Sequence, residues 1–429
     1  MVSERGKKVT SRYDNSGEED FLHGYREIGS ESPSLLLLEQ AIQEIRDGEM
    51  YPISPKIFLL ASYGIPTQYD NSRYAIVDLD EFLVYFPFAQ DFGPVDASCI
   101  IRFCQSLTRI LRCHSNKTII LRSPPTAASI TNAVLLIGAY EILCQSSSCR
   151  EACLSCRSVP SSLLLPYLDA TRTGSCLLPH KHVLAGLQKA HEQGWLEGMM
   201  TNVWELEEYE HYADPLNGDI NVIIPHKLLA LQSPTDRIPD GQEWTDEGYV
   251  RKFHPKFLLR AFQAMDVKCV VRLNASQYDP KIFTDRGIQV VDLFCSDSPV
   301  PSTQIIFRFI QLVEKACGLV AVHCDNGLGL TGCIIGTYLM AMRGFTAKEA
   351  VGWIRVMRPG SVLGAQQEFL ESHEHAMQRA GMVMETRNEK IPGEAEEAVS
   401  LTSLEVLQSS PWRRQTNPSL AVMDLIDHH

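Results

Sequence analysis

The stretch LVAVHCDNGLGLTGCIIGTYLMAM, residues 319–342, decides how this chain is interpreted. It opens with a short apolar run that predicts a fully buried strand, and this strand ends at Cys324. A loop containing Gly327 and Gly329 follows, and an apolar helix is expected from about Thr331. A strand, a glycine loop and a helix N-terminus form a cradle for anions, because backbone N–H groups point inward and the helix dipole favours negative charge. A cysteine at the mouth of such a cradle is expected to be a thiolate near neutral pH.

The composition is that of a soluble globular protein with reduced cysteines. The chain has 429 residues, enough for two or three domains, and is 45% hydrophobic and 21% charged. Its net charge of −13 argues against binding to nucleic acid or to an anionic membrane, and is compatible with basic peptide partners. We expect no membrane span and no signal peptide, because the long apolar runs that either would need are absent from the sequence. The 13 cysteines, several of them inside apolar segments, favour a cytoplasmic or nuclear location.

The order of strand, loop and apolar helix occurs twice. Residues 118–121 predict a buried strand, which precedes a Ser/Pro loop at 122–129 and an apolar helix containing Ile-Gly-Ala-Tyr at 137–140. The later helix carries Ile-Gly-Thr-Tyr at 335–338. This internal repeat predicts two versions of one α/β unit. The first loop has neither cysteine nor glycine, so we expect it to be structural.

The predicted architecture is α/β, with two tandem domains that each have a central sheet flanked by helices. In chain order we expect a partly disordered N-terminal extension (1–48), a first domain (49–200), an acidic linker (201–219), a second domain (220–384) and a flexible tail (385–429). Within the second domain, residues 249–265 predict one helix. Residues 294–301 form a loop that follows a strand, where α/β proteins place function.

Two polar motifs have simple interpretations. Cys149-x3-Cys153-x2-Cys156 resembles a metal cluster, but no second Cys/His cluster stands at zinc-like spacing. We therefore expect ordinary thiols at the end of a helix, no metal and no cofactor. The acidic linker, rich in glutamate at 205–210, is on composition alone a solvated charged face.

Motifs in both halves are similar to those of the cell-division-cycle-fourteen family of dual-specificity protein phosphatases, in the cysteine-dependent phosphatase superfamily. The resemblance covers roughly residues 50–375. It is carried by Asp91-Phe92-Gly93-Pro94, Phe103-Cys104, Leu136 to Tyr140, Glu208 to Tyr212, Asn217-Gly218-Asp219, Val271 to Asn274, Phe283-Thr284-Asp285, Asp292-Leu293-Phe294, Arg358 to Val362 and Gln366-Gln367.

This resemblance implies two tandem phosphatase-like domains, of which the first is non-catalytic and the second carries the active site. It implies a cell-cycle phosphatase whose substrates are phosphoproteins, typically with phosphoserine before proline and a basic residue nearby. It implies no oligomeric state.

The family mechanism, carried over by resemblance, assigns roles to individual residues. A thiolate attacks phosphorus, an acid protonates the leaving oxygen, and water then hydrolyses the phosphocysteine. Cys324 matches the nucleophile, Asp297 the general acid, and Thr331 the hydroxyl that stabilises the departing thiolate. Gln366 and Gln367 match the glutamines near the attacking water. The phosphate loop comprises Cys324 with His323, Asp325, Asn326, Gly327, Leu328, Gly329 and Leu330.

The resemblance also locates a substrate groove and several departures from the family pattern. Glu210 and Asp219 match acidic residues that read a substrate's basic side chain, while Ala213 stands at a third groove position. Ser298 replaces the glycine that usually follows the acid, and Ala365 replaces a proline. We expect altered motion of the acid loop and weakened or shifted specificity.

Leu330 is the largest departure, because the family has arginine there. That arginine donates two parallel N–H bonds to the phosphoryl oxygens and stabilises their charge in the transition state. Losing one preorganised donor typically costs about 3–4 kcal/mol, or about 10²–10³ in rate. Asp325 stands where the family usually has lysine, so the two positions change from +2 to −1. Such a loop should repel a dianionic phosphate.

Two hypotheses follow from these residues. The first is a pseudophosphatase that keeps the fold and the groove and works by binding partners, which the paired changes at Asp325 and Leu330 favour. The second is an enzyme with low or altered activity, which the retained Cys324, Asp297 and Thr331 favour. No substitute cation is evident, because Arg343, Arg355 and Arg358 lie on later elements and Arg272 belongs to the family pattern.

Overall fold

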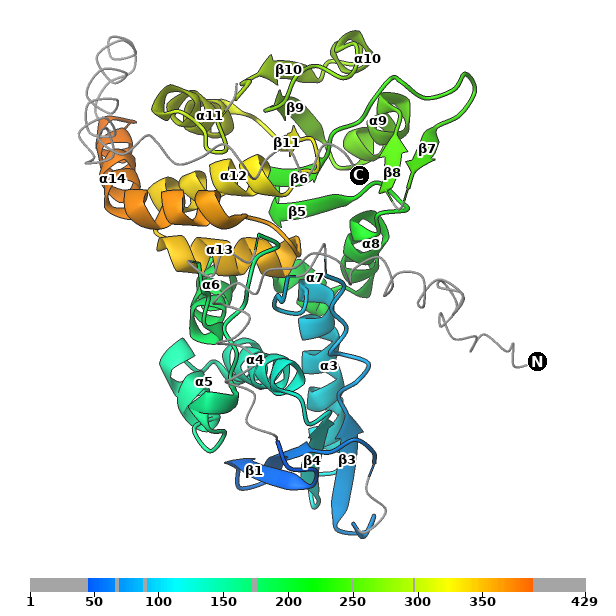
Figure 1. The fold of residues 1–429 in the computed structure, drawn as a ribbon, viewed down its shortest axis with the longest axis vertical. Coiled ribbons are helices and arrows are strands. Elements are labelled where there is room, and N and C mark those ends of the chain that lie inside the picture. Colours follow the sequence, from blue (N-terminus) through cyan, green and yellow to red (C-terminus); the bar gives the residue numbers. More distant parts are fainter. Residues whose placement is uncertain are drawn as a thin grey trace, which may run out of the picture.

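The computed structural model describes residues 45–65, 69–87, 91–171, 176–248, 250–295 and 298–388, with side chains to residue 384. These residues form two halves stacked along the long axis of the molecule (Figure 1). The expected N-terminal extension, except its last residues, and the expected tail beyond residue 388 lie outside the described part of the chain.

The N-terminal half contains a four-stranded sheet in the order β1-β2-β4-β3. Its strands are β1 (Glu49–Ser54), β2 (Ile57–Ala61), β3 (Tyr74–Asp78) and β4 (Thr118–Ser123). β1 runs antiparallel to β2, whereas β2 and β3 both pair with β4 in parallel. The central strand β4 is almost entirely buried, which explains its apolar sequence.

The C-terminal half contains a five-stranded sheet in the order β10-β9-β11-β6-β5. The strands are β5 (Ile220–Ile224), β6 (Leu228–Gln232), β9 (Val267–Arg272), β10 (Gln289–Asp292) and β11 (Leu319–Cys324). All pairs are parallel except β5 with β6. Every residue of β11 is buried, because this central strand is covered on both faces, as its apolar sequence predicts.

Helices cover both sheets. They are α3 (Ala97–Cys113), α4 (Ala127–Gln145), α5 (Cys149–Ser155), α6 (His180–Glu192), α7 (Glu197–Thr201), α8 (Val203–Ala213), α9 (Pro255–Ala264), α10 (Lys281–Thr284), α11 (Thr303–Lys315), α12 (Gly329–Met342), α13 (Ala347–Met357) and α14 (Gly364–Asn388). Among the described helices only α4 is long and apolar enough to cross a membrane, and 78% of it is buried inside the protein.

The predicted internal repeat is confirmed. β4 leads through a three-residue loop into α4, and β11 leads through residues 325–328 into α12. α12 begins at Gly329, two residues before the expected start. In the first copy the hydroxyl of Thr126 caps α4 by accepting from Ser129 N at 3.1 Å, so this loop serves the helix itself.

Three predicted elements differ from the structure. The single helix expected over 249–265 is wrong: β8 (Val250–Phe253) pairs with β7 (Trp244–Glu247) as a hairpin, and α9 begins only at Pro255. Proline favours the first helical turn, and the His254 side chain caps it. The acidic linker is mostly the helix α8, and α14 continues four residues past the expected domain end at 384.

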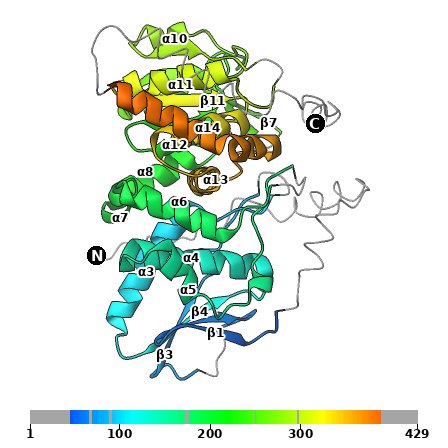
Figure 2. The same ribbon diagram turned by 90° about the vertical axis from the view of Figure 1, so that its left-hand side faces the viewer.

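The two halves meet through α6 and α13 (Figure 2). Gly186 of α6 lies so close to α13 that a Cβ there would be 2.3 Å from the carbonyl oxygen of Glu349. Lys189 forms an ion pair with Glu349 at 2.7 Å. Trp195 stacks on Phe345. One hydrophobic core runs through both halves, so the α6–α13 contact is part of that core.

Candidate active site

Cys324 lies at the carboxyl end of the central strand of the C-terminal sheet. β11 is flanked by β9 and β6, and Cys324 pairs with Gln232 at the end of β6. The phosphate loop leaves the sheet at this edge and enters α12. Open α/β sheets bind ligands at the carboxyl ends of their strands, and Cys324 occupies this position in the fold.

The backbone of the phosphate loop forms the expected cradle. Gly327 has a φ of +67°, and a Cβ at this position would be 1.9 Å from the Leu231 carbonyl oxygen. Only glycine therefore lets the loop turn this closely over the end of β6. No described residue accepts a hydrogen bond from the backbone N–H groups of residues 325–328. Together with the N-terminus of α12, these groups can hold an anion.

Arg358, just after α13, holds the loop from below. Its guanidinium donates to the Gly327 carbonyl at 2.9 Å and to the Asn326 carbonyl at 3.1 Å. It also pairs with Asp219 at 2.6 Å and donates to Asn221 Oδ1 at 2.6 Å. The Arg358 side chain is 3% exposed, so its donors serve the scaffold and not the surface of the cradle.

Asp325 places a fixed negative charge at the mouth of the cradle. One carboxylate oxygen accepts from Asn274 Nδ2 at 2.7 Å and from Gln277 Nε2 at 2.9 Å. Its carbonyl accepts from Ser233 N at 3.1 Å. The side chain is exposed although it is held on two sides. An approaching phosphate would therefore meet an ordered carboxylate.

Leu330 contributes no charge, and the nearby arginines are engaged elsewhere. The Leu330 side chain packs against the hydrophobic core. Arg272 pairs with Asp292 at 2.6 Å, Arg343 donates to Tyr338 Oη at 3.0 Å, and Arg355 is buried against the Ser361 and Val362 carbonyls. Among the described residues, Arg358 is the only cation that donates to the phosphate loop, and it donates to carbonyl oxygens.

His323 precedes the nucleophile position and is fully buried on the other face of the sheet. Its Nε2 lies 3.0 Å from Tyr278 Oη. Burial, assisted by the positive charge of Arg272, lowers the pKa of His323 to about 3. The imidazole is therefore neutral at pH 7, and Tyr278 fixes its orientation.

The other catalytic candidates are only partly brought together. Gln366 reaches the site: its Nε2 donates to the Pro299 carbonyl at 2.9 Å, and it packs beside Gly329. Gln367 is instead buried between Arg355 and Glu371. The Thr331 hydroxyl is buried without a hydrogen-bond partner.

Asp297 lies outside the described residues, but the loop on either side of it is anchored. Cys295 N donates to the Leu273 carbonyl at 3.0 Å, and Pro299 is the acceptor for Gln366. Ser298, the departure expected to alter loop motion, donates through its Oγ to the Val300 carbonyl at 2.8 Å. The role assigned to Asp297 stays a prediction.

The two groove carboxylates are already paired within the chain. Both oxygens of Glu210 accept from the Arg102 guanidinium, and one also accepts from Ser98 Oγ at 2.6 Å. Hydrogen bonding to Arg102 overcomes the opposing effect of burial and lowers the pKa of Glu210. Asp219 pairs with Arg358. A basic substrate side chain would have to compete with these arginines, which sequence reasoning did not anticipate.

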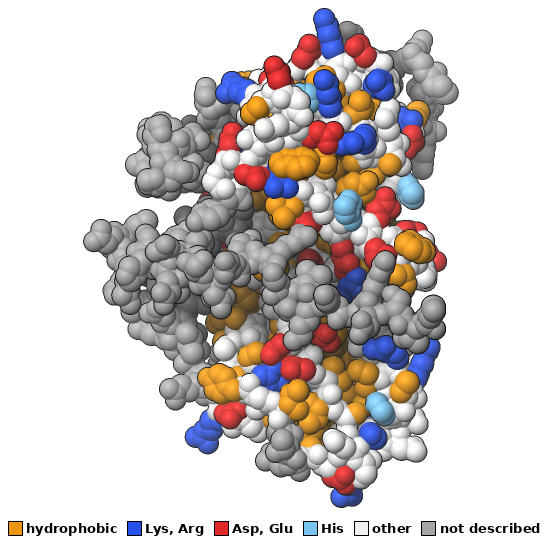
Figure 3. Space-filling model, turned by 90° about the vertical axis from the view of Figure 1, so that its right-hand side faces the viewer, with side chains coloured by type: hydrophobic (Ala, Val, Ile, Leu, Met, Phe, Trp, Pro, Cys, Tyr) orange, Lys and Arg blue, Asp and Glu red, His pale blue; other side chains and the backbone are white. Residues whose placement is uncertain are grey.

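The acidic surface itself is present around the middle of the molecule. Figure 3 shows acidic side chains gathered there, where α8 lies in Figure 1. Glu205, Glu207 and Glu208 of α8 are exposed, as expected for a solvated charged face.

Sequence reasoning missed the residues that hold Asp325. Asn274 belongs to a motif quoted for the resemblance, but its contact partner is 51 residues away. Gln277 carries no sequence signal of its role. Among the described residues no group of His, Cys, Asp or Glu is arranged to hold a metal ion.

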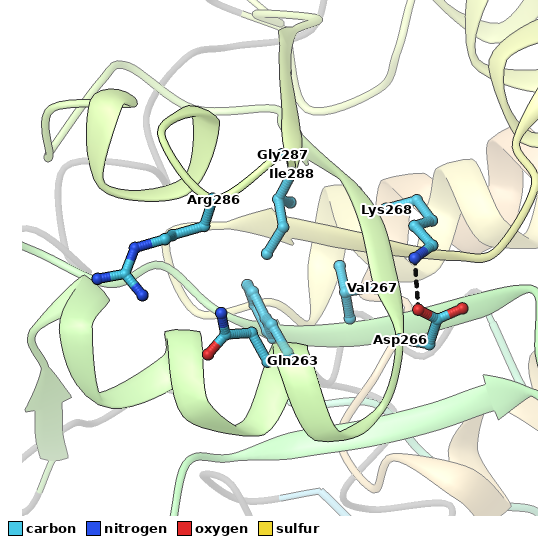
Figure 4. A pocket seen from close by; sticks show the side chains of 8 residues that line it. Gln263, Asp266, Val267, Lys268, Arg286, Gly287 and Ile288 are labelled. Atoms are coloured by element: carbon cyan, nitrogen blue, oxygen red, sulfur yellow. Dashed lines mark ion pairs between the residues drawn. The ribbon is translucent and has the colours of Figure 1, made fainter.

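A separate hollow lies at the opposite edge of the C-terminal sheet (Figure 4). It is lined by the end of α9, the start of β9 and the turn before β10, with Lys268 paired to Asp266 at 2.5 Å. These are the amino ends of the strands, so the hollow is distinct from the Cys324 site.

Comparison with known proteins agrees with this geometry. Residues 52–190 match the family described as dual specificity protein phosphatase, N-terminal half, and residues 256–374 match the dual specificity phosphatase catalytic domain. The chain is 36% identical over 330 residues to dual specificity protein phosphatase CDC14AB of Danio rerio, covering 76% of this chain and 52% of that protein.

Two human proteins are similar to the same extent. Identity is 35% over 327 residues to CDC14A of Homo sapiens, covering 75% of this chain and 53% of that protein. It is 32% over 332 residues to CDC14C of Homo sapiens, covering 76% and 71%. The chain spans about half the length of CDC14AB and CDC14A. With tandem domains and this level of identity, the chain belongs to the CDC14 family of dual-specificity protein phosphatases.

Proposed function

We propose that this chain is a CDC14-type pseudophosphatase, a phosphatase-like protein whose chemistry is severely impaired and which acts by binding phosphoproteins with basic residues near the phosphosite. One observation carries the proposal: Asp325 holds an ordered carboxylate at the mouth of the cradle, while no described cation donates to a position where a phosphate would bind. Phosphoryl transfer depends almost entirely on positioning and charge stabilisation, so this loop lacks the main catalytic contribution.

A second candidate is an enzyme of low activity, because parts of the mechanism remain. The orphan hydroxyl of Thr331 is costly to bury unless it gains a partner, and a departing thiolate at Cys324 would provide one. Gln366 joins the acid loop to Gly329. In this alternative Asp297 remains the acid, and turnover is slow because the arginine clamp is missing.

The test is turnover of an aryl phosphate and of a phosphoserine-proline peptide by the purified full chain. Leu330→Arg, Asp325→Lys, their combination and Cys324→Ser are measured in parallel with human CDC14A. We expect the double variant to exceed the wild type by about 10²–10³ or more, because it restores a charged clamp and removes the repelling carboxylate.

Wild-type turnover near that of CDC14A, abolished by Cys324→Ser, would overturn the proposal. A wild-type rate that is about 10²–10³ lower but still lost in Cys324→Ser would favour the low-activity enzyme. An inactive double variant that keeps its fold would contradict the assignment of the loss to positions 325 and 330.

A further inference from the structure

The N-terminal half contains a cysteine pair that the phosphatase chemistry does not use. Cys149 is the first residue of α5, and Cys153 lies one turn later on the same face. Both side chains are half-buried, whereas Cys156, just beyond the helix, is buried. The three were expected to be ordinary thiols at the end of a helix. Two of them instead open a helix of their own.

This face of α5 lies against the first turn of α6. Cys149 Sγ is 3.4 Å from the Lys181 carbonyl oxygen, and Cys149 N donates to Gln188 Oε1 at 2.6 Å. α6 begins with His180 and Lys181, and its dipole adds positive character at that end. The pair therefore lies in the electropositive, partly exposed surroundings in which thiolates form.

The two thiols have opposite acid–base character. A hydrogen bond from Cys149, followed by one from His180, lowers the pKa of Cys153 below that of an ordinary thiol. The same interaction with Cys153, together with burial, raises the pKa of Cys149. The charged groups around the pair are His180 and Lys181 of α6 and Glu349 of α13. Cys153 is thus the anion and Cys149 its donor.

Other thiols in the described chain lack this combination. Cys113 and Cys317 are exposed, but no described thiol or base is paired with them. Cys104 and Cys144 form a second pair between α3 and α4, but Cys104 is 0% exposed and its partner thiol is screened on that side. The described residues offer no metal-binding group at Cys149 and Cys153 either, so redox chemistry is the remaining use of a close dithiol.

We propose that Cys149 and Cys153 form a peroxide-reactive dithiol site, distinct from Cys324. The Cys153 thiolate attacks one oxygen of hydrogen peroxide, the O–O bond breaks, and hydroxide leaves, giving a sulfenic acid at Cys153. Cys149 then attacks that sulfur, the S–O bond breaks, and the hydroxyl leaves as water with the Cys149 proton. Two thiols have lost two electrons, and one peroxide has been reduced to water.

Closing the disulfide requires α5 to change shape. Side chains four residues apart in a helix have Cβ atoms about 5–6 Å apart, whereas a disulfide needs about 3.5–4.5 Å. The first turn is held by a capping box between Ser148 and Glu151 and by the bond from Cys149 N to Gln188. Oxidation therefore loosens this turn and weakens its contact with α6, the helix that joins the two halves.

The experiment treats the full-length protein with hydrogen peroxide and maps thiols by mass spectrometry after alkylation. We expect a Cys149–Cys153 disulfide in the wild type and a sulfenic acid at Cys153, trapped by dimedone, in Cys149→Ser. Cys153→Ser should show neither product, while Cys113→Ser serves as the matched control and should behave as the wild type. At pH 6, alkylation of Cys153 should be at least about tenfold faster than that of Cys113.

Two results would overturn the proposal in folded proteins, with circular dichroism checking the fold. One is equal labelling and oxidation of Cys153, Cys113 and Cys317. The other is a disulfide or sulfenic acid that persists in Cys153→Ser. Hydrogen exchange of residues 148–155 should rise on oxidation of the wild type and stay unchanged in Cys149→Ser. An unchanged wild-type pattern would contradict the closure of the disulfide in α5.

Discussion

Side chains around Cys324 show how one residue changes what a conserved backbone shape attracts. The loop needs Gly327 for its left-handed turn and Arg358 for its support, and both are present. Asp325 sits on this unchanged backbone with a charge opposite to the one a phosphate requires. Asn274 and Gln277 hold that carboxylate in place, so the side chain cannot simply turn away.

The neighbouring His323 predicts a pH effect on stability. Its folded-state pKa of about 3 lies below the roughly 6.5 of an unfolded histidine, so the unfolded chain binds a proton first as the pH falls. The stability that neutral His323 contributes is complete above pH 6.5 and is lost progressively below it. The free energy of unfolding should fall by about 1.4 kcal/mol per pH unit from this residue, or about 2 kcal/mol between pH 6.5 and 5.

Urea unfolding at pH 7, 6 and 5 measures this slope. His323→Asn should flatten it, whatever its effect at pH 7, because asparagine does not titrate. His375→Asn, at an exposed position on α14, should keep the wild-type slope. Equal slopes for the wild type and His323→Asn would show that the buried imidazole is not the group responsible.

At the scale of elements, the site is a junction of strand ends supported from a helix end. β11 supplies Cys324, β6 supplies the backbone that Gly327 approaches, and the end of α13 supplies Arg358. Arg358 also joins this junction to β5 through Asp219 and Asn221. The loop conformation therefore depends on elements more than a hundred residues apart.

Arg358→Ala should destabilise the protein by about 3–5 kcal/mol, because it leaves the Asp219 carboxylate and two loop carbonyls without their buried donor. Arg358→Lys should recover only part of this loss, since an ammonium cannot reproduce the planar fork. The measurement is the urea midpoint. Arg260→Ala, which removes an exposed ion pair with Glu243, is the control and should cost at most about 1 kcal/mol. A cost for Arg358→Ala no larger than this control would refute its supporting role.

At the scale of the whole molecule, the catalytic-type half and its non-catalytic partner are packed as one body. The core is continuous between them, and α6 meets α13 with backbone almost touching backbone at Gly186 and Gly352. Two helices approach this closely only where side chains are absent. The arrangement also explains why a structural change in α5, next to α6, can be felt by the C-terminal half.

Gly186→Ala should therefore weaken the junction. The new Cβ would be 2.3 Å from the Glu349 carbonyl oxygen, a rigid backbone atom, and overpacking of this kind typically costs about 1–3 kcal/mol. We expect calorimetry to show a lower melting temperature and a separation of the transitions of the two halves. Gly198→Ala is the control, because its Cβ would meet only the flexible Glu205 carboxylate. An equal melting temperature for both variants would contradict a tight α6–α13 contact.

Local patterns in the sequence determined the repeated strand-loop-helix unit, the all-buried β11 and the position of Cys324, because apolar runs and glycines act over a few residues. The same patterns misassigned residues 249–265, where the charged β8 resembles a helical turn until it pairs with β7. Helix period alone does not distinguish a hairpin that is stabilised by its partner strand.

Tertiary structure alone decided the partners of the charged groups. Glu210 is paired with Arg102, 108 residues away, and Asp325 is held by Asn274, 51 residues away. The loss of positive charge at positions 325 and 330 can be read from the sequence, because it is a matter of residue identity. Whether another cation replaces it, and whether a groove carboxylate is free, depends on which distant side chains the fold brings within hydrogen-bond distance.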